Sequence, residues 1–448
     1  MADVTRALAA FVAEAPPGVA SARATDVIKQ ATLDLLGVTV LGSDEDAGRI
    51  ALDYATSQAS PGPASVWGGH GQRLAPSLAA FVNGTAGHAL DYDDIGVGVG
   101  HVSVAIMPAV FAIAEQVEAD GATFVDALVL GYEVAHRLTT MYSDTRLGPY
   151  AAGYHKPSAY AVFGGAAGCA RLLGLDVEQT ACAFGMAASQ SGGLRANFGT
   201  MTKPMHAGIA NRTAIEVALL AQAGFTASTT ALEQRFGWHD VICRGEGDLD
   251  GILDGLGSSY AVENGLVFKA YPCCGANHYA IDGVINLMRA EGLASSDVAA
   301  IDVTLERRNL EEVLVYPWAR TPLEGKFSLA YNVAAAVTDG AVTVETFTDA
   351  AVERLAGERD RVRVHATDDL PQNGARVRIE TADGRVLERE QMVLRGSLED
   401  PMTWGELEVK FRANVRHRIG DAGADAVVAG IRTLEQQPTL KAVTSHLV

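Results

Sequence analysis

Apolar residues in the first 265 positions recur at the spacing of amphipathic and buried helices. Within residues 23–42 they fall near helical spacing at Val27, Ile28, Ala31, Leu35 and Val38. The same pattern predicts further helices over residues 75–90, 104–119, 123–143, 158–173, 177–190 and 206–223. Because these helices follow one another without alternating strands, we expect an all-helical domain over residues 1–265.

The pattern changes after residue 265. Apolar and polar residues alternate, as in half-buried strands, at Ile301, Val303 and Leu305, at Val362 and Val364, and at Val377 and Ile379. Asp383-Gly384 lies between two such runs and predicts a hairpin turn. Helical patterns at 276–291, 328–337 and 346–356 are interleaved with the strands, so residues 266–395 are expected to form a smaller α+β domain.

The C-terminal tail, residues 396–448, is expected to return to the helical domain. Leu407, Phe411 and Val415 are spaced by four, which predicts one apolar helix face that packs against another element. The predicted fold class is therefore mainly α, with a large helical domain made from the N-terminal part and the tail, and a smaller α+β domain between them.

Composition and charge limit the classes of partner. The chain has 448 residues, of which 48% are hydrophobic, and a net charge of −19, which argues against nucleic acid or an anionic membrane as the main partner. The sequence contains no apolar run long enough for a transmembrane helix and no basic start followed by an apolar stretch, so we expect a cytoplasmic protein. An odd number of cysteines without regular spacing favours reduced thiols at Cys169, Cys182, Cys243, Cys273 and Cys274.

Three separated segments place acids, imidazoles and ammonium groups in small, Gly- and Pro-punctuated sequence. They are HALDYDD at residues 88–94 with His101 beyond it, GYHKPS at 153–158, and TKPMHAG at 202–208. A lone Asp, His or Lys is more often structural than catalytic, but their recurrence in an apolar chain predicts one polar site assembled from distant segments. Such a site suits proton transfer on a small anion.

The lysines in these segments are candidate carboxylate ligands. Lys203 precedes Pro204 at a plausible helix start, where free backbone amides favour an anion. Lys269 lies at the predicted domain junction and could close the pocket from the other domain.

Alternative chemistries fit less well. Asp91, Asp93 and Asp94 could bind a hard cation, but their spacing is not that of an EF-hand loop, and the nearby His and Lys groups suit an anion better. The sequence contains no P-loop, no Gly-x-Ser-x-Gly elbow, no HExxH and no paired CxxC motif. These absences argue against a P-loop nucleotide site, a hydrolase of the Gly-x-Ser-x-Gly type and a zinc site.

Taken together, the segments resemble the MmgE/PrpD family, which includes 2-methylcitrate dehydratase, cis-aconitate decarboxylase and iminodisuccinate epimerase. The resemblance rests on HALDYDD, His101, GYHKPSAY, TKPMHAG, FKAYPCCGANH and FSLAYNVAAAV, spread over residues 83–337. It implies a homodimer, an active site between the helical domain and an α+β lid, and catalysis without metal or cofactor.

The resemblance also implies roles for individual residues. It places Asp91, His101, His155, Lys203, Lys269 and Tyr331 at catalytic positions of the cleft, and Asp94, Cys274 and His278 at substrate-binding positions beside the two lysines. Lys203 and Lys269 would hold carboxylates and stabilise developing charge, one of His101 and His155 would act as base and the other as acid, and Asp91 would orient an imidazole.

We predict a lyase of the dehydratase or decarboxylase type that removes a proton next to a carboxylate of a small di- or tricarboxylate. Two positions depart from the family pattern: Ile95 stands where the decarboxylase and the dehydratase tend to have a hydroxyl residue, and Cys274 where the decarboxylase has a histidine. Both departures slightly favour the alternative, an epimerase of a substrate such as iminodisuccinate, whereas family frequency favours the lyase. A second alternative is a non-catalytic carboxylate-binding protein on the same fold.

Overall fold

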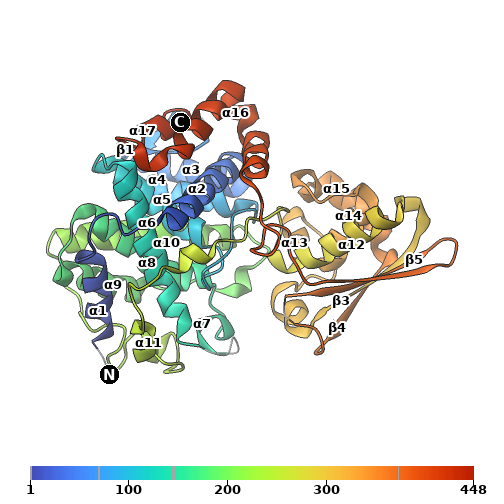
Figure 1. Ribbon diagram of the computed structural model, residues 1–448, viewed down its shortest axis with the longest axis horizontal. Helices are drawn as coiled ribbons and strands as arrows, with labels where there is room; N and C mark the ends of the chain where they lie inside the picture. The colour runs from blue at the N-terminus through green and yellow to red at the C-terminus, as the bar shows by residue number, and fades with distance from the viewer. Residues whose placement is uncertain (1–2, 69–70, 143–146, 372, 448) are drawn as a thin grey trace.

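The computed structural model describes residues 3–68, 71–142, 147–371 and 373–447 and has two lobes of unequal size (Figure 1). The larger lobe is built from helices, and the smaller lobe combines helices with a four-stranded sheet. This arrangement confirms the predicted fold class.

The larger lobe, called the helical domain below, combines the N-terminal part of the chain with the tail. Its helices are α1 (Val4–Ala13), α2 (Ala22–Gly42), α3 (Asp46–Ser57), α4 (Pro76–Ala89), α5 (Val102–Gln116), α6 (Gly121–Thr140), α7 (Gly148–Ala151), α8 (Lys156–Leu173), α9 (Val177–Gln190), α10 (Thr202–Gln222), α11 (Trp238–Val241), α16 (Trp404–Arg432) and α17 (Lys441–Thr444). It also contains a two-stranded ribbon, β1 (Pro61–Ser65) and β2 (Arg73–Leu74). The prediction of an all-helical domain was therefore wrong at this ribbon. The sequence pattern missed this ribbon because two prolines and a glycine lie in β1 and resemble a chain break.

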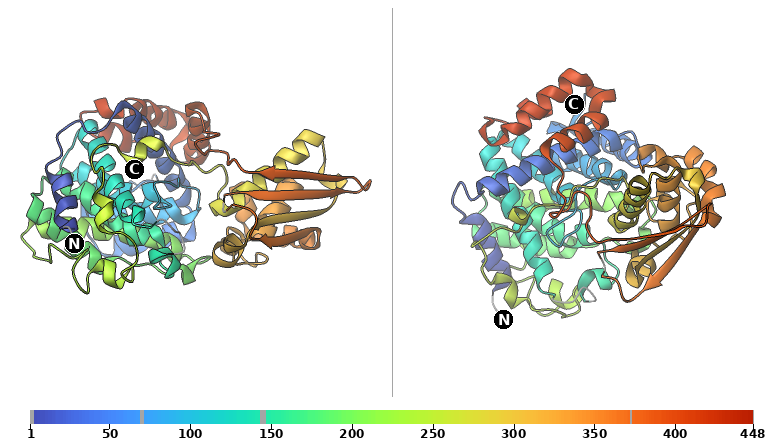
Figure 2. Two further views of the ribbon diagram at one scale, coloured as in Figure 1. Left: turned by 60° about the horizontal axis from the view of Figure 1, so that its bottom comes forward. Right: turned by 45° about the vertical axis from the view of Figure 1, so that its right-hand side comes forward.

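The tail returns to the helical domain as predicted. Helix α16 packs beside α2, as Figures 1 and 2 show. Leu407, Phe411 and Val415 are buried in the same core as α2, and the Phe411 ring lies against Gly37. The chain ends therefore complete one hydrophobic core.

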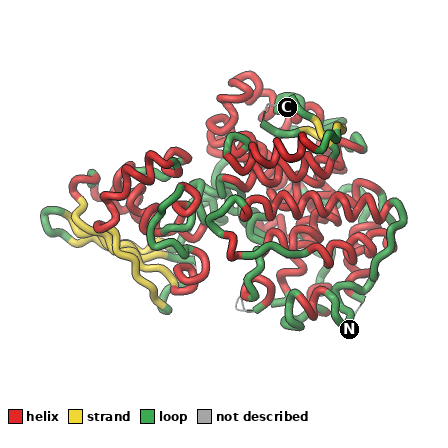
Figure 3. Tube along the Cα trace, turned by 180° about the vertical axis from the view of Figure 1, so that it is seen from behind, coloured by secondary structure: helices red, strands yellow, loops and turns green. Residues whose placement is uncertain are grey.

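The α+β domain has its own core. It contains α12 (His278–Glu291), α13 (Pro322–Gly325), α14 (Leu329–Asp339), α15 (Asp349–Leu355), β3 (Val298–Glu306), β4 (Val362–Thr367), β5 (Ala375–Thr381) and β6 (Val386–Gln391). The strand order is β4-β3-β5-β6, with β3 parallel to β4 and antiparallel to β5. Helices α12 and α14 contact the sheet, whose strands are yellow in Figure 3. The predicted hairpin at Asp383-Gly384 joins β5 to β6.

The alternating residues of the sheet behave differently in central and edge strands. Val303 and Val377 face each other across β3 and β5 and are fully buried. In the edge strand β4, by contrast, Val364 is 38% exposed. The exact domain boundaries at 265/266 and 395/396 stay a prediction.

Small residues set the helix packing that assembles the site. Helices α4 and α10 meet at Gly84 and Gly208, and a Cβ at Gly84 would lie 3.1 Å from the Gly208 Cα. From this contact, the chain runs forward along α4 to Asp91 and backward along α10 to Lys203. The close approach thus brings these two side chains to the same end of the helix pair.

Within the described residues, no helix has the length and apolarity that crossing a membrane requires.

Candidate active site

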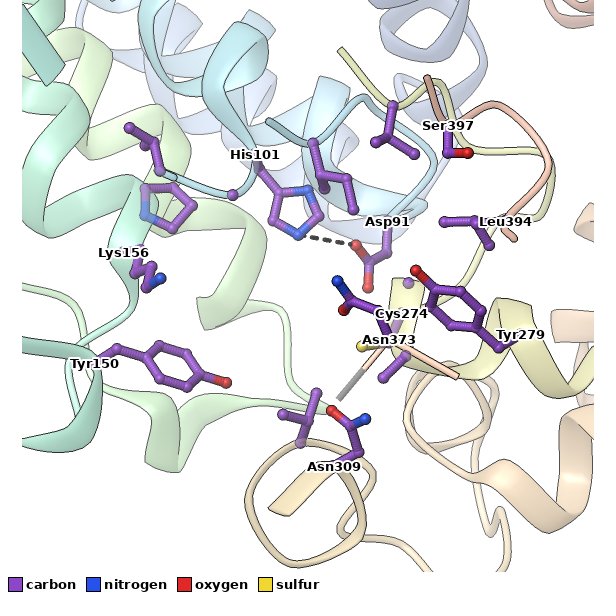
Figure 4. A pocket seen from close by; sticks show the side chains of 18 of the residues that line it. Asp91, His101, Tyr150, Lys156, Cys274, Tyr279, Asn309, Asn373, Leu394 and Ser397 are labelled. Atoms are coloured by element: carbon purple, nitrogen blue, oxygen red, sulfur yellow. Dashed lines mark ion pairs between the residues drawn. The ribbon is translucent and has the colours of Figure 1, made fainter. Parts of the chain in front are cut away.

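A cleft of about 570 Å³ is lined by residues of both domains (Figure 4). The helical domain contributes charged and titratable side chains, among them Asp91, His101, His155, Lys156 and Lys203. The α+β domain contributes mainly neutral ones, among them Cys274, Tyr279, Asn309, Phe327 and Leu394. The groups able to move protons therefore lie on one wall of the cleft.

Asp91 lies just beyond the end of α4 in a left-handed backbone conformation, which is uncommon for residues other than glycine. Its φ is 52°, in the left-handed region, where a side chain with a Cβ is disfavoured. The turn is closed by the Asp91 N–H, which donates to the His88 carbonyl at 3.2 Å. Residues held in such conformations concentrate at functional sites, because the surrounding structure must offset the strain.

Three cationic or titratable groups meet one oxygen of Asp91. Lys269 Nζ donates to Oδ1 at 2.6 Å and to the Asp91 carbonyl at 2.8 Å. Lys203 Nζ lies 3.1 Å and His101 Nε2 3.4 Å from the same Oδ1. Burial raises the pKa of Asp91, but Lys203 and Lys269 outweigh it and hold the pKa well below the usual range, so Asp91 is ionised near neutral pH.

Asp93 anchors two histidines at once. Its Oδ1 lies 2.9 Å from His88 Nδ1 and its Oδ2 lies 2.9 Å from His101 Nδ1. An ionised carboxylate only accepts hydrogen bonds, so both Nδ1 atoms carry the proton and the His101 lone pair is at Nε2, on the side of Asp91. Burial, outweighing the Asp93 carboxylate, lowers the pKa of His101 to about 3, so this imidazole is neutral near pH 7.

His155 and His206 form a second imidazole pair. Their Nδ1 atoms lie 3.2 Å apart, and the His155 ring packs edge-on against Phe198. Burial, with Lys203 next in effect, lowers the pKa of His155 well below its usual value. His155 is therefore also neutral near pH 7, with one N–H to donate and one lone pair to accept a proton.

The Lys203 ammonium is buried and retains unused donors. The residue is 4% exposed, and its Nζ makes no hydrogen bond to any described residue in spite of its ion pair with Asp91. It lies 5.3 Å and 5.9 Å from the ring centres of Phe327 and Phe198. A buried ammonium without hydrogen bonds is costly, so the Lys203 donors are available to an acceptor that enters the cleft.

Helix starts add positive potential around the same cavity. His101 and His155 directly precede α5 and α8, and Lys203 lies in the first turn of α10. Unpaired backbone N–H groups at a helix start attract anions. Three such starts at one cleft favour a substrate with several negative charges.

The structure places four of the predicted site residues outside the cleft lining. Tyr331, Asp94, His278 and Lys269 are not among the residues that line the cleft. The Tyr331 hydroxyl donates to the Thr346 carbonyl at 2.5 Å inside the α+β core, and His278 Nε2 lies 3.2 Å from the Cys273 carbonyl. Both side chains are fully buried. They belong to segments that carry the family motifs, but neither side chain reaches the cavity.

Asp94 and Lys269 lie behind the cleft wall. Asp94 is hydrogen-bonded to Ser103, whose hydroxyl also accepts from Tyr132 at 2.6 Å. No cation of the described residues lowers the pKa of Asp94, and burial raises it to about 8. Lys269 is 1% exposed and contacts Asp91 from behind the cleft wall. Of the other predicted residues, Asp91, His101, His155, Lys203 and Cys274 do line the cleft.

Sequence reasoning gave no role at an anion site to several buried polar groups near the cleft: His88, Asp93, His206, Lys326 and Lys410. His88, Asp93 and His206 lie inside the quoted motifs, so recurrence within those motifs was the available signal. Lys326 donates to the carbonyls of Leu90 and Pro272, at 2.9 Å and 3.2 Å, and so connects the two domains. Lys410 comes from the tail, and no local pattern in the tail marks it.

Two groups of side chains have the spacing of metal ligands. His88, His101 and His155 form one, and His88, Asp91, Asp93 and His101 the other, with ligand atoms within 4.8 Å of one another. In the second group the Asp91 oxygen already faces two lysines, and both Asp93 oxygens hold imidazole Nδ1 atoms. A cation there would compete with two ammonium groups, so the donor set suits an anion at the cleft better.

The fold and the cleft are typical of a two-domain enzyme with a polar site between its domains. The helical domain carries the charged groups, and the α+β domain covers them. The MmgE/PrpD N-terminal domain matches residues 6–248, and the MmgE/PrpD C-terminal domain matches residues 271–436. The chain belongs to the MmgE/PrpD family and is an enzyme of that type.

The chain is also similar to individual members of the family. It is 27% identical to a human cis-aconitate decarboxylase over 435 residues, which cover 94% of this chain and 89% of the relative. It is 28% identical to a cis-aconitate decarboxylase-like protein of Aspergillus oryzae, covering 92% and 90% of the two chains. It is 28% identical to a cis-aconitate decarboxylase of Aspergillus terreus, covering 70% of each chain. These relatives give the epimerase alternative no support.

Proposed function

We propose that this protein is a cofactor-independent lyase that decarboxylates an unsaturated tricarboxylate of the cis-aconitate type. The observation that carries the proposal is the buried Lys203 ammonium, which lines the cleft beside two neutral imidazoles and has donors that no described residue uses. A substrate carboxylate supplies the missing acceptor. The names of the relatives support the choice of substrate.

Decarboxylation of such an acid creates negative charge that the site must stabilise. The bond between a carboxylate carbon and its neighbour breaks, and CO₂ leaves. The electron pair moves into the adjacent double-bond system, which takes up a proton at its far carbon. The charge that develops is shared with a remaining carboxylate, so a fixed ammonium donor there lowers the barrier.

The cleft provides the groups for both halves of this step. Lys203, held in place by Asp91, donates to the carboxylate on which charge develops. His155, which is neutral near pH 7, has an N–H proton to give, whereas His101, whose N–H is bonded to Asp93 through Nδ1, first takes up a proton from solvent at Nε2 and then gives it to the far carbon. Asp93 fixes the His101 tautomer by accepting from Nδ1, which leaves Nε2 toward Asp91.

The dehydratase form of the lyase has less support from the cleft wall. Loss of water requires a polar contact to the departing hydroxyl, and the Ile95 side chain on the cleft wall offers none. Val99, Val267, Phe198 and Phe327 make the same lining apolar. An apolar surface favours a carboxylate leaving as neutral CO₂ over one that stays charged.

Proton and carbon NMR in D2O tests the proposal against its alternatives. The purified protein is incubated with cis-aconitate, citrate, 2-methylcitrate and iminodisuccinate, and Lys441→Met, a change at an exposed lysine on α17, is the control for Lys203→Met. We expect loss of one carboxyl carbon from cis-aconitate, at a rate that is at least about 100-fold lower in Lys203→Met and unchanged in the control. Vinyl signals without CO₂ would indicate a dehydratase, α-deuteration alone an epimerase, and binding without turnover would contradict the proposal.

The homodimer and the cytoplasmic location stay predictions from the family resemblance and the sequence. Sedimentation of the purified protein tests the first of these.

A further inference from the structure

The charged groups at the reacting end of the cleft nearly cancel. Asp91 and Asp93 are ionised, Lys203 and Lys269 face Asp91, and the histidines that line the cleft are neutral near pH 7. Counting lysines as +1 and carboxylates as −1 gives a balance near zero. A di- or tricarboxylate brings two or three negative charges, so this end alone does not neutralise it.

Lys156 is a cation of the cleft lining that the reacting end does not use. It begins α8 directly after His155, and its side chain points into the cleft in Figure 4. Its Nζ donates to the Gly98 carbonyl at 3.3 Å and lies 5.5 Å from the centre of the Tyr150 ring. It forms no ion pair with any residue that the structure describes. Burial and the neighbouring Arg308 lower the pKa of Lys156, so an arriving carboxylate would restore a favourable environment for its charge.

Tyr150 supplies a neutral donor beside Lys156. Its hydroxyl makes no hydrogen bond to another described residue, and burial raises its pKa to about 12, so the proton is retained. The Arg195 guanidinium stacks 4.0 Å from the ring centre and donates to the Tyr150 carbonyl at 3.0 Å, which fixes the ring. Lys156 and Tyr150 thus present an ammonium and a phenol from one wall.

The opposite wall carries the other acidic group of the lining. Glu399 accepts from the Ser397 hydroxyl at 2.8 Å, and Ser397 lies across the cleft from Lys156 in Figure 4. The cleft is therefore electrically asymmetric. An anionic substrate gains most by directing its additional carboxylate toward Lys156 and away from Glu399.

We propose that Lys156, with the Tyr150 hydroxyl, binds the substrate carboxylate remote from the breaking bond and selects tricarboxylates over acids that lack that group. This inference rests on the proposed function, since it assigns a second anchoring point within the same cleft. Neither residue takes part in the bond-breaking step; both are specificity residues.

Binding of unreactive acids tests this assignment independently of turnover. Isothermal titration compares tricarballylate, a saturated tricarboxylate, with glutarate and methylsuccinate, which each lack one of its carboxylates. We expect Lys156→Met to weaken tricarballylate binding by about 10- to 100-fold, the range for a lost charged hydrogen bond. Lys156→Arg should restore most of the affinity, and Tyr150→Phe should have a smaller effect in the same direction.

The pattern across ligands distinguishes a specific contact from a general disturbance. For the dicarboxylate that lacks the remote group, wild type and Lys156→Met should bind equally, and Lys441→Met should match wild type with every acid. Equal tricarballylate affinity in wild type and Lys156→Met would overturn the inference, as would an equal loss for all three acids. Failure of cis-aconitate turnover in the wild type would instead overturn the proposed function and leave this binding result to be judged separately.

Discussion

Two buried lysine–aspartate pairs lie close together in this protein and have opposite surroundings. In the cleft, Asp91 faces Lys203 and Lys269, and Lys203 makes no hydrogen bond to the described residues. Behind the cleft, Lys410 Nζ lies 2.8 Å from Asp34 Oδ1 and also donates to the carbonyls of Tyr92 and Lys269, both at 2.9 Å. Lys203 therefore has donors available to a ligand, whereas groups of the protein accept the hydrogen bonds of Lys410.

The aspartates of the two pairs respond accordingly. Burial raises the pKa of both, but two lysines outweigh burial at Asp91, whereas one lysine does not at Asp34, where the pKa stays raised. The comparison shows that burial of a lysine does not by itself indicate chemistry. What separates a functional lysine from a structural one is whether its hydrogen-bond donors are satisfied by the protein.

The largest expected effect is on stability, at the structural pair. Lys410→Met leaves Asp34 buried without its partner and removes the link between the segments that carry Tyr92 and Lys269. We expect the free energy of unfolding to fall by about 3–5 kcal/mol. Urea denaturation followed by circular dichroism measures it, and Lys410→Met combined with Asp34→Asn should recover part of the loss. If Lys410→Met alone were as stable as wild type, the pair of Lys410 and Asp34 would not have the structural role proposed for it.

The corresponding change in the cleft should affect activity rather than stability. Lys203→Met removes an ammonium that pairs with Asp91 but makes no hydrogen bond to a described residue, while Asp91 retains Lys269. We expect kcat/KM to fall by about 100- to 1,000-fold, as for other lost donors to developing charge. The melting temperature should stay close to that of wild type or rise. Steady-state kinetics and thermal melts of Lys203→Met and Lys441→Met measure both effects. A large fall in the melting temperature of Lys203→Met with an unchanged kcat/KM would contradict the difference between the two pairs.

A substitution at Asp93 tests whether this carboxylate affects the reaction by holding the His101 imidazole in one tautomer. Asp93→Asn replaces one of two accepting oxygens by an NH₂ group, so His88 and His101 cannot both donate from Nδ1. We expect kcat to fall by about 100-fold while KM changes little, because proton transfer is affected more than binding. Equal effects on kcat and on binding of an unreactive tricarboxylate would contradict a role through His101.

Asp94 extends the comparison to a buried carboxylate with no lysine beside it. Its pKa is raised by burial to about 8, so the folded state holds a proton that the unfolded state releases above its ordinary pKa of 3.8. The folded state then binds more protons between these values, and stability falls as pH rises through that window and levels off above about pH 8.

Asp94→Asn replaces the protonated acid by a neutral side chain and should remove this dependence. We expect the difference between variant and wild type to shift in favour of the variant by about 1 kcal/mol for each pH unit between pH 5 and 8. Thermal melts at a series of pH values measure the shift. Parallel stability profiles would show that Asp94 is ionised in the folded protein.

The smallest effect is expected at Tyr331, which the structure places in the α+β core. Tyr331→Phe removes one buried hydrogen bond to the Thr346 carbonyl, at a cost of about 1 kcal/mol. Because the hydroxyl does not line the cleft, kcat and KM should be unchanged. A kinetic defect without a stability defect would return Tyr331 to the site.

Much of this organisation could be predicted from the sequence, and the exceptions have physical causes. Helical spacing located α2 and α4 to within a residue or two, because their buried faces are long and apolar. The β1–β2 ribbon was not predicted, because a five-residue strand with two prolines shows little alternation of apolar and polar residues. Motif recurrence found Asp91, His101, His155 and Lys203.

The residues that the sequence misplaced depend on which way a side chain points. His278 and Tyr331 belong to the right segments, but each turns into the α+β core. Lys410 lies more than 300 residues from Tyr92, to which it donates, and such a contact has no local signal in either segment. Tertiary packing, rather than periodicity, fixes these positions.

The most direct test of the central claim follows CO₂ release from carboxyl-labelled ¹³C-cis-aconitate by wild type, Lys203→Met and Lys441→Met in parallel. The account predicts equal release by wild type and Lys441→Met, with a five-carbon unsaturated dicarboxylate formed in equal amount, and at least about a 100-fold lower rate for Lys203→Met. Equal rates in all three proteins would contradict a role in the reaction for the Lys203 donors that no described residue uses. No release by any of them, with the acid bound and intact, would contradict decarboxylation itself.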